Sequence, residues 1–219
     1  MRILGHFHLR ITMESLRDLT KAEESKRIGA VYNLLSRVFM GEVDARFLRE
    51  LRTECFYETL KDTGINLGDR FLNQQEDKLL EALAVEYARL FIVPGVSISP
   101  YESVHIEQMH YGEKAQQVAS FYQKCGMKIV DETLMPDHIG LELELMSYLK
   151  QRQFEAGEQG NEDGVLKWTE LAQEFMSAHP GKWAEEFFSS VQQESLDPFY
   201  KQMAKLGKRL MEIEMSEVR

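Results

Sequence analysis

Two stretches of acidic and histidine side chains could supply metal ligands. His138 and Glu142 are four residues apart, a spacing that places both on one face of a helix and can serve a metal. Glu102, His105 and Glu107 would add ligands from an earlier stretch. The sequence has no HExxH motif, and carboxylates are common in any acidic helix. A small helical metalloprotein that uses His138 and Glu142 with Glu102 and His105 is therefore the alternative hypothesis, not the leading one.

Motifs for nucleophilic or phosphate chemistry do not occur. The sequence contains no GxSxG elbow, no GxxxxGK[ST] phosphate loop and no GxGxxG fingerprint. Cys55 and Cys125 form no CxxC or Cys/His pattern, and two thiols do not make a disulfide framework. We expect both to be free thiols in a reducing compartment. The sequence thus predicts a binding protein without catalytic residues, metal or cofactor.

A proline-punctuated segment interrupts the helical pattern at residues 93–106. Pro94, Gly95 and Pro100 cannot propagate a helix, so a loop of about ten residues is predicted. Long loops in compact domains are uncommon unless they are functional. The preceding helix ends in Leu90 and Phe91, and these would be either core residues or one apolar wall of a pocket.

A second polar pair follows Pro136, which is expected to open a helix. Asp137 and His138 would then lie in its first turn, where the helix dipole stabilises a carboxylate and disfavours a protonated imidazole. A neutral His138 can both donate and accept a hydrogen bond, which suits a peptide backbone. The alternative is a capping aspartate beside a histidine whose hydrogen bonds are satisfied internally.

Composition restricts the class of partner. The 26 basic and 36 acidic residues give a formal net charge of -10 among 219 residues, so nucleic acid and anionic lipid are disfavoured partners and a basic peptide is favoured. No apolar run approaches the roughly 18 residues of a membrane span. Residues 1–10 lack the pattern of a secretory signal, and Met13 is a second candidate start that would make residues 1–12 an extension. We expect a cytoplasmic protein.

Helical periodicity dominates the rest of the chain and predicts an all-α, single-domain bundle of seven to eight helices. Residues 1–20 are predicted to be an N-terminal extension, and residues 21–219 the helical domain. A glycine-rich linker is expected at residues 157–164, and such a hinge would permit either a monomer or a domain-swapped dimer. The helices are expected at residues 25–39, 44–60, 75–92, 112–125, 136–149, 165–176, 182–192 and 198–214.

Four motifs in order resemble the TorD/DmsD/NarJ family of molybdoenzyme assembly chaperones. The first is Glu86-Tyr87-x-x-Leu90-Phe91 with Pro94, Pro100, Ser103 and Val104. The others are Tyr111-Gly112-Glu113, then Pro136-Asp137-His138 with Gly140 to Leu149, and last Asp197-Pro198-Phe199-Tyr200. The likeness covers about residues 24–211, and before residue 75 only the helical pattern is shared.

The resemblance implies a helical chaperone and not an enzyme. Such proteins bind the twin-arginine signal peptide, or another region, of a molybdopterin oxidoreductase catalytic subunit, assist cofactor insertion and prevent premature export. The resemblance assigns the peptide site to ten residues, namely Tyr87, Leu90, Phe91, Pro94, Pro100, Tyr101, Glu102, Ser103, Asp137 and His138.

Two positions depart from the family pattern. Some relatives have tryptophan where Tyr101 stands, and many have glycine or alanine where Glu102 stands. Glu102 is predicted to pair with an arginine of the peptide, or to mark a different cargo. The guanine-nucleotide binding of some relatives has no phosphate loop to support it in this sequence.

Overall fold

The computed structural model describes residues 21–96, 98–129 and 133–217, and within these ranges every regular secondary-structure element is a helix. The predicted extension at residues 1–20 lies outside the described residues. The all-α class is confirmed, and the described part contains eleven helices where seven to eight were expected. They are α1 (Lys21–Met40), α2 (Ala45–Leu51), α3 (Glu54–Asp62), α4 (Gly68–Asn73), α5 (Glu76–Phe91), α6 (Glu102–Glu107), α7 (Glu113–Lys124), α8 (Ile139–Glu158), α9 (Glu162–Ala178), α10 (Pro180–Glu194) and α11 (Pro198–Glu217).

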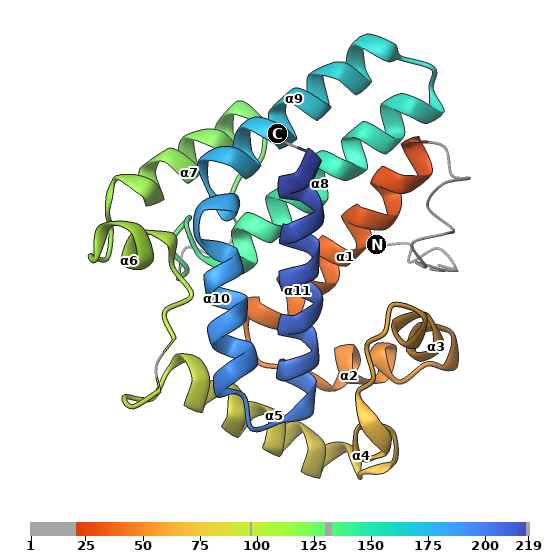
Figure 1. Ribbon diagram of the computed structural model, residues 1–219, viewed down its shortest axis with the longest axis vertical. Helices are drawn as coiled ribbons and strands as arrows, with labels where there is room; N and C mark the ends of the chain where they lie inside the picture. Colours follow the sequence, from red (N-terminus) through yellow and green to blue (C-terminus); the bar gives the residue numbers. More distant parts are fainter. Residues whose placement is uncertain (1–20, 97, 130–132, 218–219) are drawn as a thin grey trace.

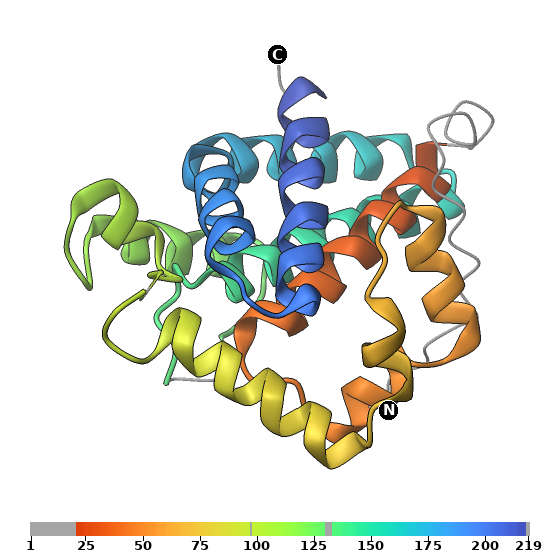
Figure 2. The ribbon, with the colours of Figure 1, turned by 60° about the horizontal axis from the view of Figure 1, so that its bottom comes forward.

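Three helix pairs build the body of the molecule. The most extensive contacts join α1 to α8, α8 to α9 and α10 to α11 (Figure 1). Helix α5 runs across one end of the bundle, near the turn between α10 and α11 (Figure 2). Helix α2 packs against α5, α4 leads into its N-terminus, and α3 packs against α2. The segment between α5 and α6 therefore starts at the end of the bundle where α10 finishes.

Small residues let α1 and α8 approach closely. A Cβ atom on Gly140 would lie 2.8 Å from the backbone of Met40, so only glycine fits at this crossing. The hydroxyl of Ser36 donates to the Gly140 carbonyl at 2.8 Å. Tyr32 and Leu35 on the same face of α1 are completely buried, as their helical spacing predicts.

A cluster of aromatic rings forms the centre of the core. Phe187 of α10 packs against Phe39 of α1 with ring centroids 5.6 Å apart, and against Phe91 of α5 at 6.0 Å. Phe188 lies 5.4 Å from both Phe39 and Phe187. Offset and edge-on ring pairs of this kind stabilise a core beyond the area they bury. The cluster fixes α10 relative to α1 and α5.

The helix predicted at residues 44–60 is wrong as a single element, because the chain turns between α2 and α3 at Arg52 and Thr53. The guanidinium group of Arg52 donates to the carbonyl oxygens of Phe71 at 2.8 Å and Gln74 at 2.7 Å. It thereby ties this turn to α4, an element that the sequence pattern did not reveal.

Two further boundaries differ from the prediction. Pro136 does not open α8, which begins at Ile139 with His138 as its N-cap. The linker expected at residues 157–164 is a turn of residues 159–161, because α8 continues to Glu158 and the side chain of Asn161 caps α9 by accepting from the Gly164 N–H at 2.9 Å. The long hinge inferred from the glycines is therefore not present.

Candidate functional site

The segment from Pro100 to Ser103 is paired with the start of α8. Tyr101 and His138 form an isolated antiparallel bridge. The Ile139 N–H donates to the Pro100 carbonyl at 2.8 Å, and the Glu102 N–H donates to the Asp137 carbonyl at 3.0 Å. The fold thus brings together two of the predicted site regions, which are 34 residues apart in sequence.

Asp137 holds this pairing in place. Its Oδ2 atom accepts from the Ser103 N–H at 2.8 Å, and both residues are fully buried. Ser103 follows the first residue of α6, so the carboxylate supplies an acceptor to a backbone N–H of the first turn that has no partner within the helix.

We expect Asp137→Ala to destabilise the protein by about 1–3 kcal/mol, because the buried Ser103 N–H loses its acceptor. Asp137→Asn should recover most of that loss, since an amide oxygen can still accept the bond. Urea unfolding of both variants measures the effect. Equal stability of the alanine and asparagine variants would contradict the role given to this hydrogen bond.

His138 is neutral, as predicted, although the main cause differs. Burial lowers the pKa of His138 to about 4, and its Nδ1 atom accepts from the Gly140 N–H at 3.0 Å as the cap of α8. The imidazole is 2% exposed. This matches the alternative of a histidine that makes its hydrogen bonds inside the protein.

Glu102 does not face solvent. Its side chain is completely buried, its Oε2 atom lies 2.8 Å from Nδ1 of His179, and its Oε1 atom lies 3.8 Å from Nζ of Lys114. Glu142 of α8 is buried beside it and accepts from Nε1 of Trp183 at 3.0 Å. Glu102 therefore contributes to an internal polar cluster between α6, α7, α8 and α10.

The metal-site alternative is not supported by this geometry. Across the described ranges, no three histidine, cysteine or acidic side chains converge in a way that could hold an ion. The Nδ1 atom of His138 is used by the cap, and Nε2 of His105 lies 2.8 Å from the Ser99 carbonyl.

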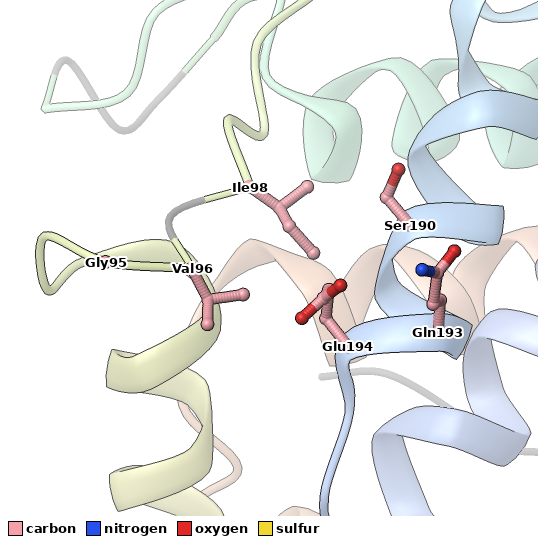
Figure 3. A pocket seen from close by; sticks show the side chains of 6 residues that line it. All are labelled: Gly95, Val96, Ile98, Ser190, Gln193 and Glu194. Carbon is pink, nitrogen blue, oxygen red and sulfur yellow. The ribbon is translucent and has the colours of Figure 1, made fainter.

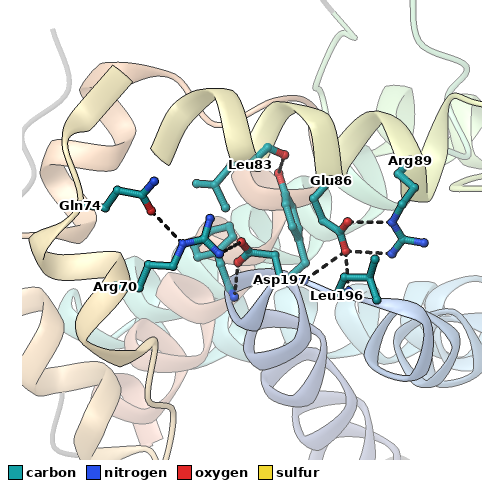
Figure 4. Close-up of polar contacts among 9 residues, drawn as sticks. Arg70, Gln74, Leu83, Glu86, Arg89, Leu196 and Asp197 are labelled. Carbon is teal, nitrogen blue, oxygen red and sulfur yellow. Dashed lines mark hydrogen bonds and ion pairs between the residues drawn. The ribbon is translucent and has the colours of Figure 1, made fainter. Parts of the chain in front are cut away.

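The Glu86-to-Phe91 motif joins α5 to the rest of the bundle (Figure 4). Burial alone would raise the pKa of Glu86, but hydrogen bonds from Arg89 and from the N–H groups of Leu196 and Asp197 outweigh it and lower that pKa. These contacts fasten α5 to the turn between α10 and α11. The three-residue spacing of Glu86 and Arg89 could have indicated their ion pair, but the backbone partners, 110 and 111 residues further along the chain, have no signal in the sequence.

The other residues of this motif divide between core and surface. Leu90 is completely buried, and Tyr87 is buried with its hydroxyl donating to the Phe39 carbonyl at 3.3 Å. Burial raises the pKa of Tyr87 to about 12. Phe91 is half-buried, and Pro94 is exposed. Tyr87 and Leu90 thus belong to the core beneath the predicted apolar surface.

A groove of about 480 Å³ lies between the 94–103 segment and the last turn of α10. Val96 and Ile98 form one side, and Ser190, Gln193 and Glu194 form the other (Figure 3). Gly95, the remaining lining residue, has a φ of +143°, which side chains rarely allow. The loop side falls inside the predicted segment, whereas the three α10 residues were missed because only tertiary packing places them there.

Apolar and acidic features meet at this groove. Ile92 and Val93, next to its loop side, are 63% and 51% exposed. The opposite side carries the Glu194 carboxylate and the C-terminal end of α10, where the helix dipole is negative. Such a surface is suited to a chain that carries a cationic residue beside apolar ones.

Comparisons with known proteins agree with this architecture. The family described as nitrate reductase delta subunit matches residues 53–189. The chaperone protein TorD of Shewanella pealeana is 25% identical over 196 residues, which is 80% of this chain and 82% of that protein. The TorD chaperone of Shewanella oneidensis is 31% identical over 135 residues, covering 54% of this chain and 62% of that protein.

A solved structure shares the fold. The crystal structure of a putative redox enzyme maturation protein from Archaeoglobus fulgidus matches with a TM-score of 0.51 and 24% identity, over 89% of this chain and 96% of that one. The curated relatives are named as chaperones and not as enzymes, which confirms the expectation that this protein is not an enzyme. No helix in the described part of the chain is long and apolar enough to cross a membrane. The match over residues 53–189 shows that the chain belongs to the nitrate reductase delta subunit family, that is, to the TorD/DmsD/NarJ group of molybdoenzyme assembly chaperones.

Proposed function

We propose that this protein is a cytoplasmic chaperone for the catalytic subunit of a molybdopterin oxidoreductase. It binds the twin-arginine signal peptide, or another region of that subunit, assists cofactor insertion and prevents premature export. The observation that carries the proposal is the groove between residues 94–103 and α10, because it offers a cationic and apolar segment a place to bind. Membership of a chaperone family supports the same proposal.

The chemistry of the groove fits the two parts of such a signal peptide. Glu194 and the carbonyl end of α10 attract the basic head, while Val96 and Ile98 in the groove, with the exposed Ile92 and Val93 just before it in the chain, offer apolar surface to the stretch that follows. The net charge of -10 adds long-range attraction for a basic partner. Electrostatics would set the association rate, and apolar contacts would slow release.

The ten predicted site residues take different parts in this proposal. Phe91, Pro94, Pro100 and Tyr101 are exposed or half-buried and can meet the peptide directly. The other six are buried and would position the segment that contacts the peptide: Tyr87, Leu90, Glu102, Ser103, Asp137 and His138.

We expect Glu194→Lys to weaken binding of a labelled twin-arginine peptide about tenfold, mainly through slower association, because the charge at the mouth of the groove is reversed. Glu185→Lys is the matched control. It makes the same change on α10, at an exposed position nine residues earlier and so on the opposite face of the helix. Fluorescence anisotropy and stopped-flow association measure both.

A pull-down from the native host then identifies the cargo. Wild type and Glu185→Lys should recover a molybdopterin oxidoreductase subunit, and Glu194→Lys should recover less. Equal recovery and equal peptide affinity for all three proteins would exclude this groove as the binding site. Recovery of no oxidoreductase subunit by wild type would refute the proposed function.

A further inference from the structure

Two completely buried carboxyl groups lie where α6, α8 and the start of α10 meet. Glu102 is the first residue of α6, and Glu142 lies in the first turn of α8. The Oε2 atom of Glu102 lies 2.8 Å from Nδ1 of His179, at the junction of α9 and α10. The Oε2 atom of Glu142 accepts from Nε1 of Trp183 at 3.0 Å. Among the described residues, neither Oε1 atom has a hydrogen-bond donor. His179 and Trp183 are four residues apart, so both carboxyl groups lie against one short stretch at the start of α10, close enough for their charges to interact.

Two ionised carboxylates are not compatible with this arrangement. Burial, and then the nearby charge of Glu102, raise the pKa of Glu142 well above its usual range, and Asp137 adds to the effect. The hydrogen bond from Trp183 opposes it but is outweighed. Like-charged carboxyl groups that share a buried site retain a proton between them. A hydroxyl on one Oε1 atom that donates to the other would satisfy both bare oxygens at once.

The surrounding charges decide which carboxyl group carries the proton. Lys114 of α7 lies 3.8 Å from Glu102, and His179 contacts it directly, so negative charge is stabilised on Glu102. Within the described ranges Glu142 makes no ion pair, and the charges that act on its pKa are those of Glu102 and Asp137. His138 caps the same helix as a neutral ring, and the hydroxyl of Tyr122 on α7 donates to the Leu141 carbonyl at 2.6 Å. The remaining titratable neighbour, His105 of α6, packs against the Trp183 ring.

We propose that Glu102 and Glu142 share one proton inside the folded protein, held on Glu142, and that this proton fixes α6 against α8 and α10. The two glutamates are then positioning residues for the groove. Glu102 begins the helix that follows the loop side of the groove, while Trp183, the partner of Glu142, belongs to α10, whose last turn forms the other side.

The shared proton makes stability depend on pH in a defined direction. The pKa of Glu142 is raised on folding, so its contribution is complete below the ordinary glutamate pKa of 4.5 and is lost as the pH rises through the folded value. Between those two values, wild type loses about tenfold in its folding equilibrium constant per pH unit through this group. A glutamine at position 142 mimics the protonated acid, because its oxygen can accept from Trp183 and its amide can donate to Glu102.

Infrared spectroscopy and unfolding together test the shared proton on the full-length protein. Wild type should retain the carbonyl stretch of a buried protonated carboxylic acid as the pH rises above 4.5, where ordinary glutamates lose their protons, and Glu142→Gln should lack it. The ratio of the folding constants of Glu142→Gln and wild type should increase about tenfold per pH unit above 4.5 and then level off. Glu158→Gln is the control, since it makes the same change at an exposed position on the same helix. A missing acid band in wild type, or a ratio that does not change with pH, would overturn the proposal.

The positioning role rests on the proposed function and needs a separate readout. The affinity for a twin-arginine peptide should fall in wild type as the pH rises through the folded pKa of Glu142, and should be much flatter in Glu142→Gln. If the acid band is present but the pH dependence of affinity is the same in both proteins, the positioning role is excluded. If no peptide binds at any pH, the proposed function fails while the infrared result still decides the shared proton.

Discussion

Replacing Phe187 with alanine is expected to lower the free energy of unfolding by about 3–5 kcal/mol. Its ring contacts Phe39, Phe91, Phe188 and Trp183 with centroids between 5.4 and 6.0 Å apart, and the side chain is completely buried. Truncation removes these contacts and leaves a cavity where α1, α5 and α10 meet. Urea denaturation followed by circular dichroism measures the loss.

Two further variants separate this effect from general sensitivity to mutation. Phe187→Leu fills much of the space and should cost clearly less than the alanine variant. Leu166→Ala removes a large apolar side chain that is 59% exposed, and should change stability by no more than about 0.5 kcal/mol. If Phe187→Ala costs no more than Leu166→Ala, the ring cluster is not the centre of the core.

Replacing Lys150 with methionine should be comparably damaging, at about 3–5 kcal/mol, because it leaves a charge buried without a partner. Nζ of Lys150 lies 2.9 Å and 2.8 Å from the two carboxylate oxygens of Glu214, with both side chains at most 10% exposed. The hydroxyl of Tyr32 also donates to Glu214, at 3.2 Å. Thermal or urea unfolding at neutral pH measures the loss.

The double variant Lys150→Met/Glu214→Leu is the informative control. With both charges removed, the apolar pair should come close to wild-type stability or exceed it, since neither ion must be desolvated. A double variant as unstable as Lys150→Met would show that the loss of stability comes from packing and not from the unpaired carboxylate of Glu214. Methionine and leucine are chosen because their volumes are similar to those of the residues they replace.

Local sequence patterns predict much of the fold. The three- and four-residue spacing of Ile28, Tyr32, Leu35 and Phe39 predicts one buried face of a helix. Tyr32, Leu35 and Phe39 are buried in α1, and Ile28, nearer its start, is half-buried. Asp197 before Pro198 predicted the start of α11 correctly. Both signals depend only on neighbouring residues, which is why they could be read without the tertiary structure.

The errors arose where distant contacts override the local pattern. The break at Arg52 is held by carbonyl groups 19 and 22 residues away, and no local signal marks it. Glu102 was expected to meet a partner, but it is buried against His179, 77 residues further along the chain. The α10 side of the groove was missed for the same reason, since Ser190, Gln193 and Glu194 look like an ordinary exposed face of a helix.

The tip of the 94–103 segment is separate from the contacts that hold its ends. The Val93 N–H donates to the Ala88 carbonyl at 2.8 Å, and the Ile98 N–H donates to the Leu90 carbonyl at 2.8 Å, while residues 94–96 between them are exposed. Substitutions of Pro94 and Val96 should therefore be nearly neutral for folding, whereas changes at Leu90, or at Gly95 with its φ of +143°, should not. On the proposed function, selection can then adjust cargo preference at Pro94 and Val96 without compromising the bundle, so that related chaperones can diverge at these positions and still share a scaffold.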